Sequence, residues 1–448
     1  MSKKILILFI LFSTAIQAQF SVSGTIVPEG NFSWILLYKL ENGKQTFVDN
    51  TTIENGNFQF KLSEDQPIGI YRAYYQIENN LFVEFLYNKE EIIFSFNSKN
   101  PAESIRFSSS EENRIYQDYY KEINEKQSKL DSLQVAYFRL EDSKSDKKII
   151  KEYKIALKEL QKTQNDFKHE SQAKLAYHFI EASAQYNAEL PLKDPQEYLG
   201  NVRSHFFDNV DFKDEKLKNS TFINDKLIDY VFYLNQAEST ETRNKLQKEA
   251  IEDASQRLAE DFDLLKNFEE SLLQKYAEEE NTEMVDFVTN GYYNKLPKEF
   301  QDSAFIFKIE SAMKTAVGKK APDFAWKENE SQKSLYGSID HDYYIVTFFG
   351  SDCQHCQKEM PEFYNFIKEI ENIKVITIGL EDETEGWEEM TANFKDFTNI
   401  LVLNKWNDQK VKDYGVTEIP SFFILDSDKT ILAKPYDVEE LKAMFEEK

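Results

Sequence analysis

The chain has only two cysteines, Cys353 and Cys356, and they lie three residues apart. Such a pair can close only on itself, so no disulfide framework can cross-link distant parts of this 448-residue chain. The fold must therefore be stabilised by packed apolar cores, and a chain of this length exceeds one core, which predicts two to four domains. Two neighbouring thiols without other partners also favour thiol–disulfide exchange over structural cross-linking.

Residues 1–18 have the pattern of an export signal. Lys3 and Lys4 precede a short apolar run, 5–12, and we expect cleavage after Ala18. The run is too short to span a bilayer, which takes roughly 20 apolar residues, and no later stretch is apolar enough to do so. A buried N-terminal strand or helix is the alternative. We therefore expect a soluble mature protein, periplasmic or otherwise exported, without a membrane span after signal removal.

The formal net charge is −25 at pH 7, and no basic block offsets it. This charge argues against a nucleic-acid partner and is more consistent with a role in solubility. Tyrosine and phenylalanine are plentiful whereas glycine and proline are scarce. That composition suits well-packed cores rather than a disordered chain.

Residues 19–110 alternate short apolar runs with turn residues. Evenly spaced short strands of this kind predict a small β-sandwich, with Asn55-Gly56 as a hairpin-turn signal. We find no catalytic constellation in this β-rich N-terminal region. The expected strands are 20–26, 34–40, 58–62, 68–75, 81–86 and 92–96.

Residues 111–315 have helical periodicity throughout. Apolar residues recur at spacings of three and four over 116–140 and again over 150–167, and the polar segment 141–146 separates the two stripes. This arrangement predicts an antiparallel helical hairpin, followed by further amphipathic helices. The aromatic stripe could be a binding face, but core packing is the favoured interpretation. Breaks between helices are expected near Pro191, Pro195 and Pro297.

Residues 316–448 alternate predicted strands with predicted helices, which indicates a layered α/β domain. The strand ending at Phe349 leads directly through Gly350-Ser351-Asp352 into the cysteine pair. The expected strands are 343–349, 373–379, 400–403 and 422–425, and the expected helices are 354–370, 387–397 and 438–445.

The predicted strand–turn–helix places Cys353 at the start of a helix, where unpaired N–H groups and the helix dipole favour an anion. A thiolate is that anion and is the attacking species. Cys356 lies one turn deeper on the same face and can resolve a mixed disulfide. His355 is expected to tune the pair as a donor or partial positive charge that stabilises the reduced form, which makes the pair more oxidising. Asp352 acts in the opposite sense unless its side chain caps the helix, so the direction of electron flow stays open.

The pair has two other interpretations. A zinc site needs two further ligands at suitable spacing, and His341 is the one nearby candidate, so we expect no metal and no cofactor. The pair could also be a vestigial motif in a domain kept for binding.

Residues 318–448 resemble the thioredoxin-like domain of the TlpA/ResA group of exported thiol–disulfide oxidoreductases. The resemblance implies that Cys353 attacks and Cys356 resolves, that Pro420 is cis and faces the pair, and that the backbone of Ile419 holds a substrate strand. The motifs that carry it, in family order, are Gly-Lys-Lys-Ala-Pro-Asp-Phe at 318–324, Val-Thr-Phe-Phe-Gly-Ser-Asp-Cys-Gln-His-Cys at 346–356, Lys-Glu-Met-Pro at 358–361, and Tyr-Gly-Val at 414–416 with Ile-Pro-Ser-Phe-Phe-Ile at 419–424.

The chain departs from the family pattern at several positions. Asp352 stands where the family usually has tryptophan, and Thr347 stands where plain thioredoxins have a buried acid. Gln354-His355 resembles the dipeptide of oxidising or isomerising thioredoxin-fold enzymes. A substitute base could come from Glu381, Glu383, Glu385 or Glu418. Residues 19–110 resemble the β-rich domain that accompanies such thioredoxin domains in exported proteins of Bacteroidetes-type bacteria, a likeness that implies no activity.

These observations predict an exported thiol–disulfide oxidoreductase that exchanges disulfides with protein substrates, and with an unidentified redox partner, through Cys353 and Cys356. The alternative is a binding or scaffolding module that carries an accessory thioredoxin domain. A thiol peroxidase is a third possibility, but it usually has a threonine three residues before the cysteine, and Thr347 lies six before Cys353.

Overall fold

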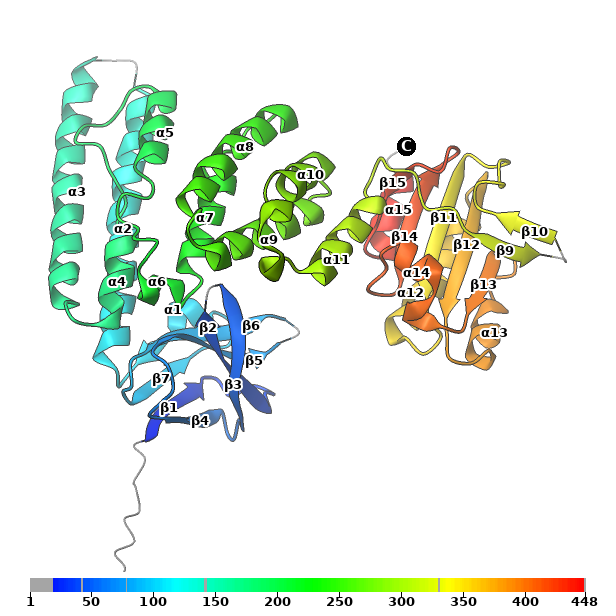
Figure 1. The fold of residues 1–448 in the computed structure, drawn as a ribbon, viewed down its shortest axis with the longest axis horizontal. Coiled ribbons are helices and arrows are strands. Elements are labelled where there is room, and N and C mark those ends of the chain that lie inside the picture. Colours follow the sequence, from blue (N-terminus) through cyan, green and yellow to red (C-terminus); the bar gives the residue numbers. More distant parts are fainter. Residues whose placement is uncertain (1–18, 42, 78, 141–142, 329–330, 447–448) are drawn as a thin grey trace, which may run out of the picture. The chain divides into compact units, whose positions relative to one another are not determined.

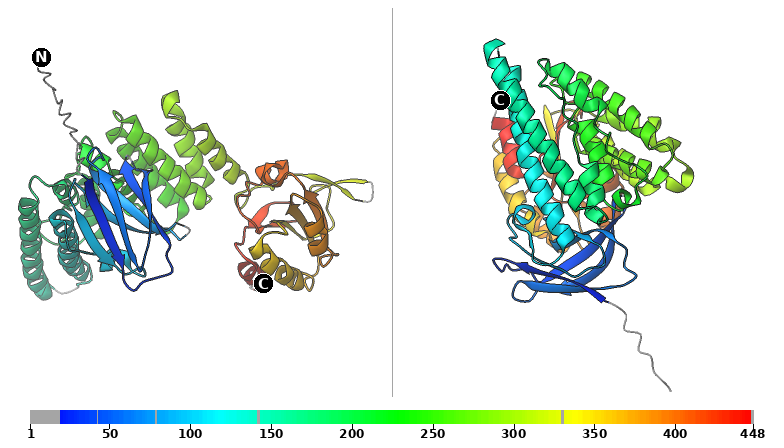
Figure 2. Two further views of the ribbon diagram at one scale, coloured as in Figure 1. Left: turned by 90° about the horizontal axis from the view of Figure 1, so that it is seen from below. Right: turned by 90° about the vertical axis from the view of Figure 1, so that its left-hand side faces the viewer.

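The structure, a computed structural model, describes residues 19–41, 43–77, 79–140, 143–328 and 331–446. The expected export signal, residues 1–18, lies outside the described residues. The chain divides into two compact units, one as far as Phe268 and one from Glu269 onward (Figures 1 and 2). Among the described residues, no helix combines the length and apolar character that crossing a bilayer requires.

The first unit begins with a β-sandwich, as expected. One sheet has the strand order β4-β1-β7-β8 and the other the order β3-β2-β5-β6. Alternate side chains of both sheets face inward because successive residues of a strand point to opposite faces, and they form one core that includes Val22, Phe60, Tyr71 and Phe94. The strands are β1 (Gln19–Ile26), β2 (Trp34–Glu41), β3 (Lys44–Thr52), β4 (Asn57–Ser63), β5 (Gly69–Gln76), β6 (Leu81–Tyr87), β7 (Ile92–Phe96) and β8 (Arg106–Phe107).

The turn at Asn55-Gly56 forms, and both residues have positive φ. It does not join two neighbouring strands of one sheet, as a hairpin turn would. It connects β3 to β4, which lie in different sheets, and an isolated bridge links Glu54 to Asn57 across the turn. Strand β3 was not predicted. In the described ranges it pairs with β2 alone, at the edge of its sheet. All of its side chains are exposed or half-buried, so it lacks the apolar alternation of a core strand.

The middle of the chain is helical. Helices α2 (Glu111–Phe138) and α3 (Ser143–Glu170) run antiparallel, since Tyr119 packs edge-on against Phe167 and Lys129 pairs with Glu159. Helix α5 begins at Pro195, where a proline suits the first helical position. Besides α2 and α3, the helices of this part are α1 (Pro101–Ser104), α4 (Leu175–Ala182), α5 (Pro195–Ser204), α6 (Glu215–Lys218), α7 (Phe222–Phe232), α8 (Thr240–Arg257), α9 (Phe262–Glu278), α10 (Thr282–Gly291), η1 (Tyr293–Lys295), η2 (Lys298–Phe300) and α11 (Ser303–Lys314).

The C-terminal part is an α/β layer structure around a five-stranded sheet with the order β13-β12-β11-β14-β15. Strands β11, β12 and β13 are parallel, and β14 and β15 are antiparallel to their neighbours. One face packs against α12 and α15 and the other against the segment around Phe324 and Tyr414. The elements are β9 (Ala325–Glu328), β10 (Ser331–Ser334), β11 (Tyr343–Phe349), α12 (Gln354–Ile367), β12 (Ile373–Leu380), α13 (Glu385–Thr391), β13 (Thr398–Val402), η3 (Lys405–Asn407), α14 (Gln409–Asp413), β14 (Ser421–Asp426), β15 (Ile431–Ala433) and α15 (Val438–Glu446).

Candidate active site

The central strand β11 delivers the cysteine pair to the end of the sheet. Its residues are almost all buried, and the chain then turns through Gly350 to Asp352 into α12. Cys353 is the N-cap of that helix, and its Sγ accepts a hydrogen bond from the backbone N of Cys356 at 3.2 Å. The sulfur therefore occupies the position where the first free N–H groups of a helix favour a negative charge.

The two sulfurs have different surroundings. Cys353 is half-buried, whereas Cys356 is fully buried in the apolar cluster with Met360 and Phe363. Burial raises the pKa of the Cys356 thiol far above its usual range, and the neighbouring Cys353 is the second cause of this rise. Both cysteines are free thiols in this structure. One thiol can thus meet a partner, while the other lies one turn below it and stays protonated.

The segment before β14 lies beside the first cysteine. The Ile419–Pro420 peptide bond is cis, and the Cys353 thiol donates to the carbonyl oxygen of Ile419 across 3.6 Å. Pro420 itself is buried. The structure therefore brings Cys353, Ile419 and Pro420 together from two distant parts of the sequence.

His355 lies close to a carboxylate. Its Nε2 lies 3.6 Å from Oε1 of Glu359, and the Glu359 side chain is only 7% exposed. The other oxygen of Glu359 accepts a hydrogen bond from the backbone N of Val438 at 3.0 Å. Sequence reasoning missed Glu359, although its position three residues after Cys356 places both on one helix face.

Asp352 does not cap the helix, and its negative charge is paired with a cation. Its Oδ2 lies 3.0 Å from Nζ of Lys405, which also contacts Asp382 at 2.8 Å. Hydrogen bonds to Asp382 and Asp352 raise the pKa of Lys405 to about 12, so this ammonium stays charged at neutral pH. The sequence left open how Asp352 acts on the thiol. In the structure a cation from η3 compensates the Asp352 charge.

The acidic residues named as substitute bases occupy different positions. Glu381 is buried and accepts two hydrogen bonds from Ser351, from its backbone N at 2.6 Å and its Oγ at 2.8 Å, so this carboxylate holds the loop before Cys353. Thr347 is fully buried in β11, and its Oγ1 has no hydrogen-bond partner. The remaining three, Glu383, Glu385 and Glu418, are exposed.

A zinc site at the pair has no support in the geometry. His341 precedes β11 and Cys353 follows it, so the length of the strand, about 20 Å, separates them. Within the described ranges no three histidine, cysteine, aspartate or glutamate side chains converge as metal ligands would.

The C-terminal α/β part is a thioredoxin-like domain. Residues 340–431 match the family model described as thioredoxin-like, which confirms the resemblance drawn from the motifs. Residues 20–116 match a second model, described as a domain of unknown function (DUF4369).

Relatives with curated names carry the same domain. The chain is 28% identical over 137 residues to the thiol-disulfide oxidoreductase ResA of Bacillus thuringiensis subsp. konkukian, which covers 30% of this chain and 77% of that protein. It is 25% identical over 137 residues to ResA of Geobacillus thermodenitrificans, covering 29% and 77% of the two chains.

Two solved structures match parts of this chain. The thioredoxin domain of a thiol-disulfide oxidoreductase from Bacteroides vulgatus is 21% identical and covers 30% of this chain and 96% of that chain, with a TM-score of 0.26. A thioredoxin-like protein from Bacteroides caccae is 22% identical and covers 58% and 98%, with a TM-score of 0.42.

Proposed function

We propose that this protein is an exported thiol–disulfide oxidoreductase that exchanges disulfides with protein substrates through Cys353 and Cys356. The observation that carries the proposal is the pairing of a half-buried sulfur at a helix start with a fully buried one a turn below. The curated relatives named for this activity match the same part of the chain. Export is proposed from the pattern of residues 1–18. The order of the strands and helices supports a division of the mature chain into three domains, 19–110, 111–315 and 316–448.

In the reducing direction, the Cys353 thiolate attacks one sulfur of a substrate disulfide. The substrate S–S bond breaks, and the leaving thiolate takes a proton from water. Cys356 then loses its proton and attacks Cys353 Sγ, which releases the second substrate thiolate and leaves a Cys353–Cys356 disulfide. The substrate gains two electrons from the pair, and a dithiol reductant returns them. The oxidising direction is the reverse of these steps.

Three groups are proposed to assist. The backbone beside Ile419 pairs with an extended substrate strand as an added β-strand would, and Pro420 shapes this segment. Glu359, the buried carboxylate one turn after Cys356, takes the proton that Cys356 must lose, since a buried carboxylate near a titrating thiol is suited to general-base work. His355 tunes the pair through its ion pair with Glu359 when protonated.

Insulin reduction with dithiothreitol tests the proposal. The full chain should accelerate the precipitation of insulin B chain over dithiothreitol alone, and Cys353→Ser should bring the rate back to that background. Equal rates for wild type and Cys353→Ser would contradict the proposal. They would favour the alternative, a binding module with an accessory thioredoxin domain, for which the cavity described below is the supporting observation.

A further inference from the structure

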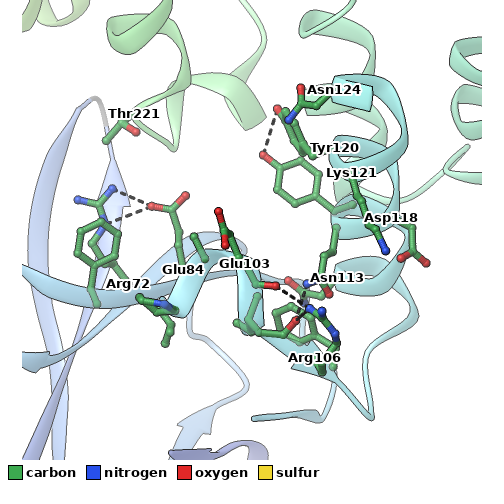
Figure 3. A pocket seen from close by; sticks show the side chains of 18 of the residues that line it. Arg72, Glu84, Glu103, Arg106, Asn113, Asp118, Tyr120, Lys121, Asn124 and Thr221 are labelled. Atoms are coloured by element: carbon green, nitrogen blue, oxygen red, sulfur yellow. Dashed lines mark hydrogen bonds and ion pairs between the residues drawn. The ribbon is translucent and has the colours of Figure 1, made fainter. Parts of the chain in front are cut away.

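The first unit contains a cavity of about 790 Å³, within the range of small-molecule binding sites. It is bounded by strands β5 and β6, by α1 and β8, and by helices α2 and α7 (Figure 3). All of these elements lie in the unit that ends at Phe268. No residue of the site around Cys353 and Cys356 lines this cavity.

Its walls are aromatic. Phe82 and Phe107 are half-buried and held by neighbouring rings, with Tyr74 at 5.2 Å and Phe94 at 5.6 Å between ring centroids. The hydroxyls of Tyr116 and Tyr120 lie 3.5 Å apart on α2. Burial raises the pKa of both phenols, so they stay neutral. Tyr116 belongs to the aromatic stripe of 116–140 that was expected to pack in the core. Tyr119, from the same stripe, is fully buried in the helical core.

One side of the cavity carries an excess of negative charge. Glu84, Glu103 and Asp225 come from β6, α1 and α7, and Figure 3 shows the Glu84 and Glu103 side chains reaching into the same space. Arg72 is the one lining cation in ion contact with them in the described structure. Two of its hydrogen bonds, at 3.1 and 2.7 Å, go to a single oxygen of Glu84, and a third goes to the Tyr74 hydroxyl at 3.4 Å. The second oxygen of Glu84 is left to accept from a ligand.

The other cations of the lining are engaged or peripheral. Arg106 donates to the backbone carbonyls of Glu103 and Ile105, at 2.9 and 2.6 Å. Lys121 lies on the exposed rim of α2. In the described structure neither forms an ion pair with a carboxylate of the lining. The four lining carboxylates, Asp118 of α2 included, outnumber the three cations, and the net charge of −25 on the chain also disfavours an anionic ligand.

A metal ion does not fit this arrangement, because in the described part of the chain no three acidic, histidine or cysteine side chains converge on one point. A larger cation does. A guanidinium or ammonium group can satisfy separated carboxylates, and it gains further from aromatic faces, as Arg72 already does 4.0 Å above the Phe82 ring. The remaining aromatic wall would cover an apolar stem.

We propose that this cavity binds an organic cation, a guanidinium or ammonium group carried on an apolar stem. A free small molecule or a basic side chain of a polypeptide would present the same chemistry. The proposal is independent of the redox function.

Calorimetric titration of the full-length chain tests this with two matched probes. n-Butylguanidinium should bind, and n-butylurea, which has the same shape without the charge, should bind far more weakly. Glu103→Gln, at an exposed position of α1, should weaken n-butylguanidinium binding about fivefold, as for one partly screened ion pair. Glu84→Gln should weaken it at least as much. Glu64→Gln, an exposed carboxylate outside the cavity, serves as the control and should change nothing.

A second arm identifies the source of the cation. A short peptide with one arginine is compared with the same peptide carrying citrulline. Preference for the arginine peptide over n-butylguanidinium would assign a polypeptide ligand, and the opposite preference a free small molecule. Equal affinity for n-butylguanidinium and n-butylurea, or binding unchanged in both Glu84→Gln and Glu103→Gln, would overturn the proposal. Insulin reduction should be unaffected by Glu103→Gln, so the two proposals fail separately.

Discussion

At the scale of single residues, the thiol chemistry depends on small differences of environment between neighbours. Cys353 and Cys356 share a helix, yet one sulfur is half-exposed at the helix start and the other is sealed in the core. Asp352 would repel a thiolate beside it, but Lys405 lies within 3.0 Å of its carboxylate. The reactivity of Cys353 is therefore expected to depend on a residue that lies more than fifty positions further along the chain.

Removing Lys405 should expose this dependence. In Lys405→Ala the Asp352 carboxylate is uncompensated, so the reaction of Cys353 with iodoacetamide at pH 7 should slow by about threefold, as expected for loss of one exposed ion pair. The double variant Lys405→Ala/Asp352→Asn should regain the wild-type rate. Peptide mapping by mass spectrometry gives the rate at each cysteine, and Cys356 should stay unmodified in the folded protein. An unchanged rate in Lys405→Ala would exclude this compensation.

At the scale of helices and strands, sequence pattern predicted those elements whose burial leaves a strong periodic signal. Strand β11 could be predicted residue for residue because both of its faces are apolar. Strand β3 could not, since an edge strand with exposed side chains has no apolar alternation. The short β15 and the β9–β10 hairpin were missed because each has too few buried residues to form a pattern.

The same limit applies to the site. The positions of Cys353, Cys356 and Pro420 followed from local motifs. The contacts of Lys405 with Asp352 and of Glu359 with Val438 join residues distant in sequence, and periodicity carries no information about such pairs. The side-chain direction of Asp352 was left open for that reason.

Helix α9 carries a buried carboxyl that makes stability depend on pH. Glu269 is 1% exposed, both of its oxygens lack hydrogen-bond partners, and burial followed by Glu270 raises its pKa to about 8. The ordinary pKa of this carboxyl is 4.5. Between pH 4.5 and pH 8, the folded state therefore binds more protons at Glu269 than the unfolded state. Stability therefore falls as pH rises through this window.

Glu269→Gln should remove that dependence. The variant should gain little over wild type at pH 5 and should be more stable at pH 9, by roughly 2–4 kcal/mol if the whole shift is expressed. Thermal unfolding followed by circular dichroism at both pH values gives the comparison. A variant that is destabilised equally at pH 5 and pH 9 would show that Glu269 is ionised and stabilised in the folded protein.

At the scale of the whole molecule, the chain joins two units with different chemistry. The C-terminal unit contains the thioredoxin-like domain with its paired thiols. The first unit contains a β-sandwich, a helical hairpin and an acidic, aromatic-walled cavity, and its β-rich part matches a domain family without an assigned function. Variants in one unit should leave the activity of the other intact, so each can be tested in the full chain.

The central claim is that Cys353 attacks the substrate and Cys356 resolves the mixed disulfide. It is tested most directly by trapping with Cys356→Ser, expressed in a host that exports the protein, followed by non-reducing gel electrophoresis of the exported fraction. We predict long-lived adducts with substrate proteins that dithiothreitol releases and that map to Cys353. They should be absent from wild type and from Cys353→Ser/Cys356→Ser. No adduct in Cys356→Ser, or adducts that persist in the double variant, would contradict the account.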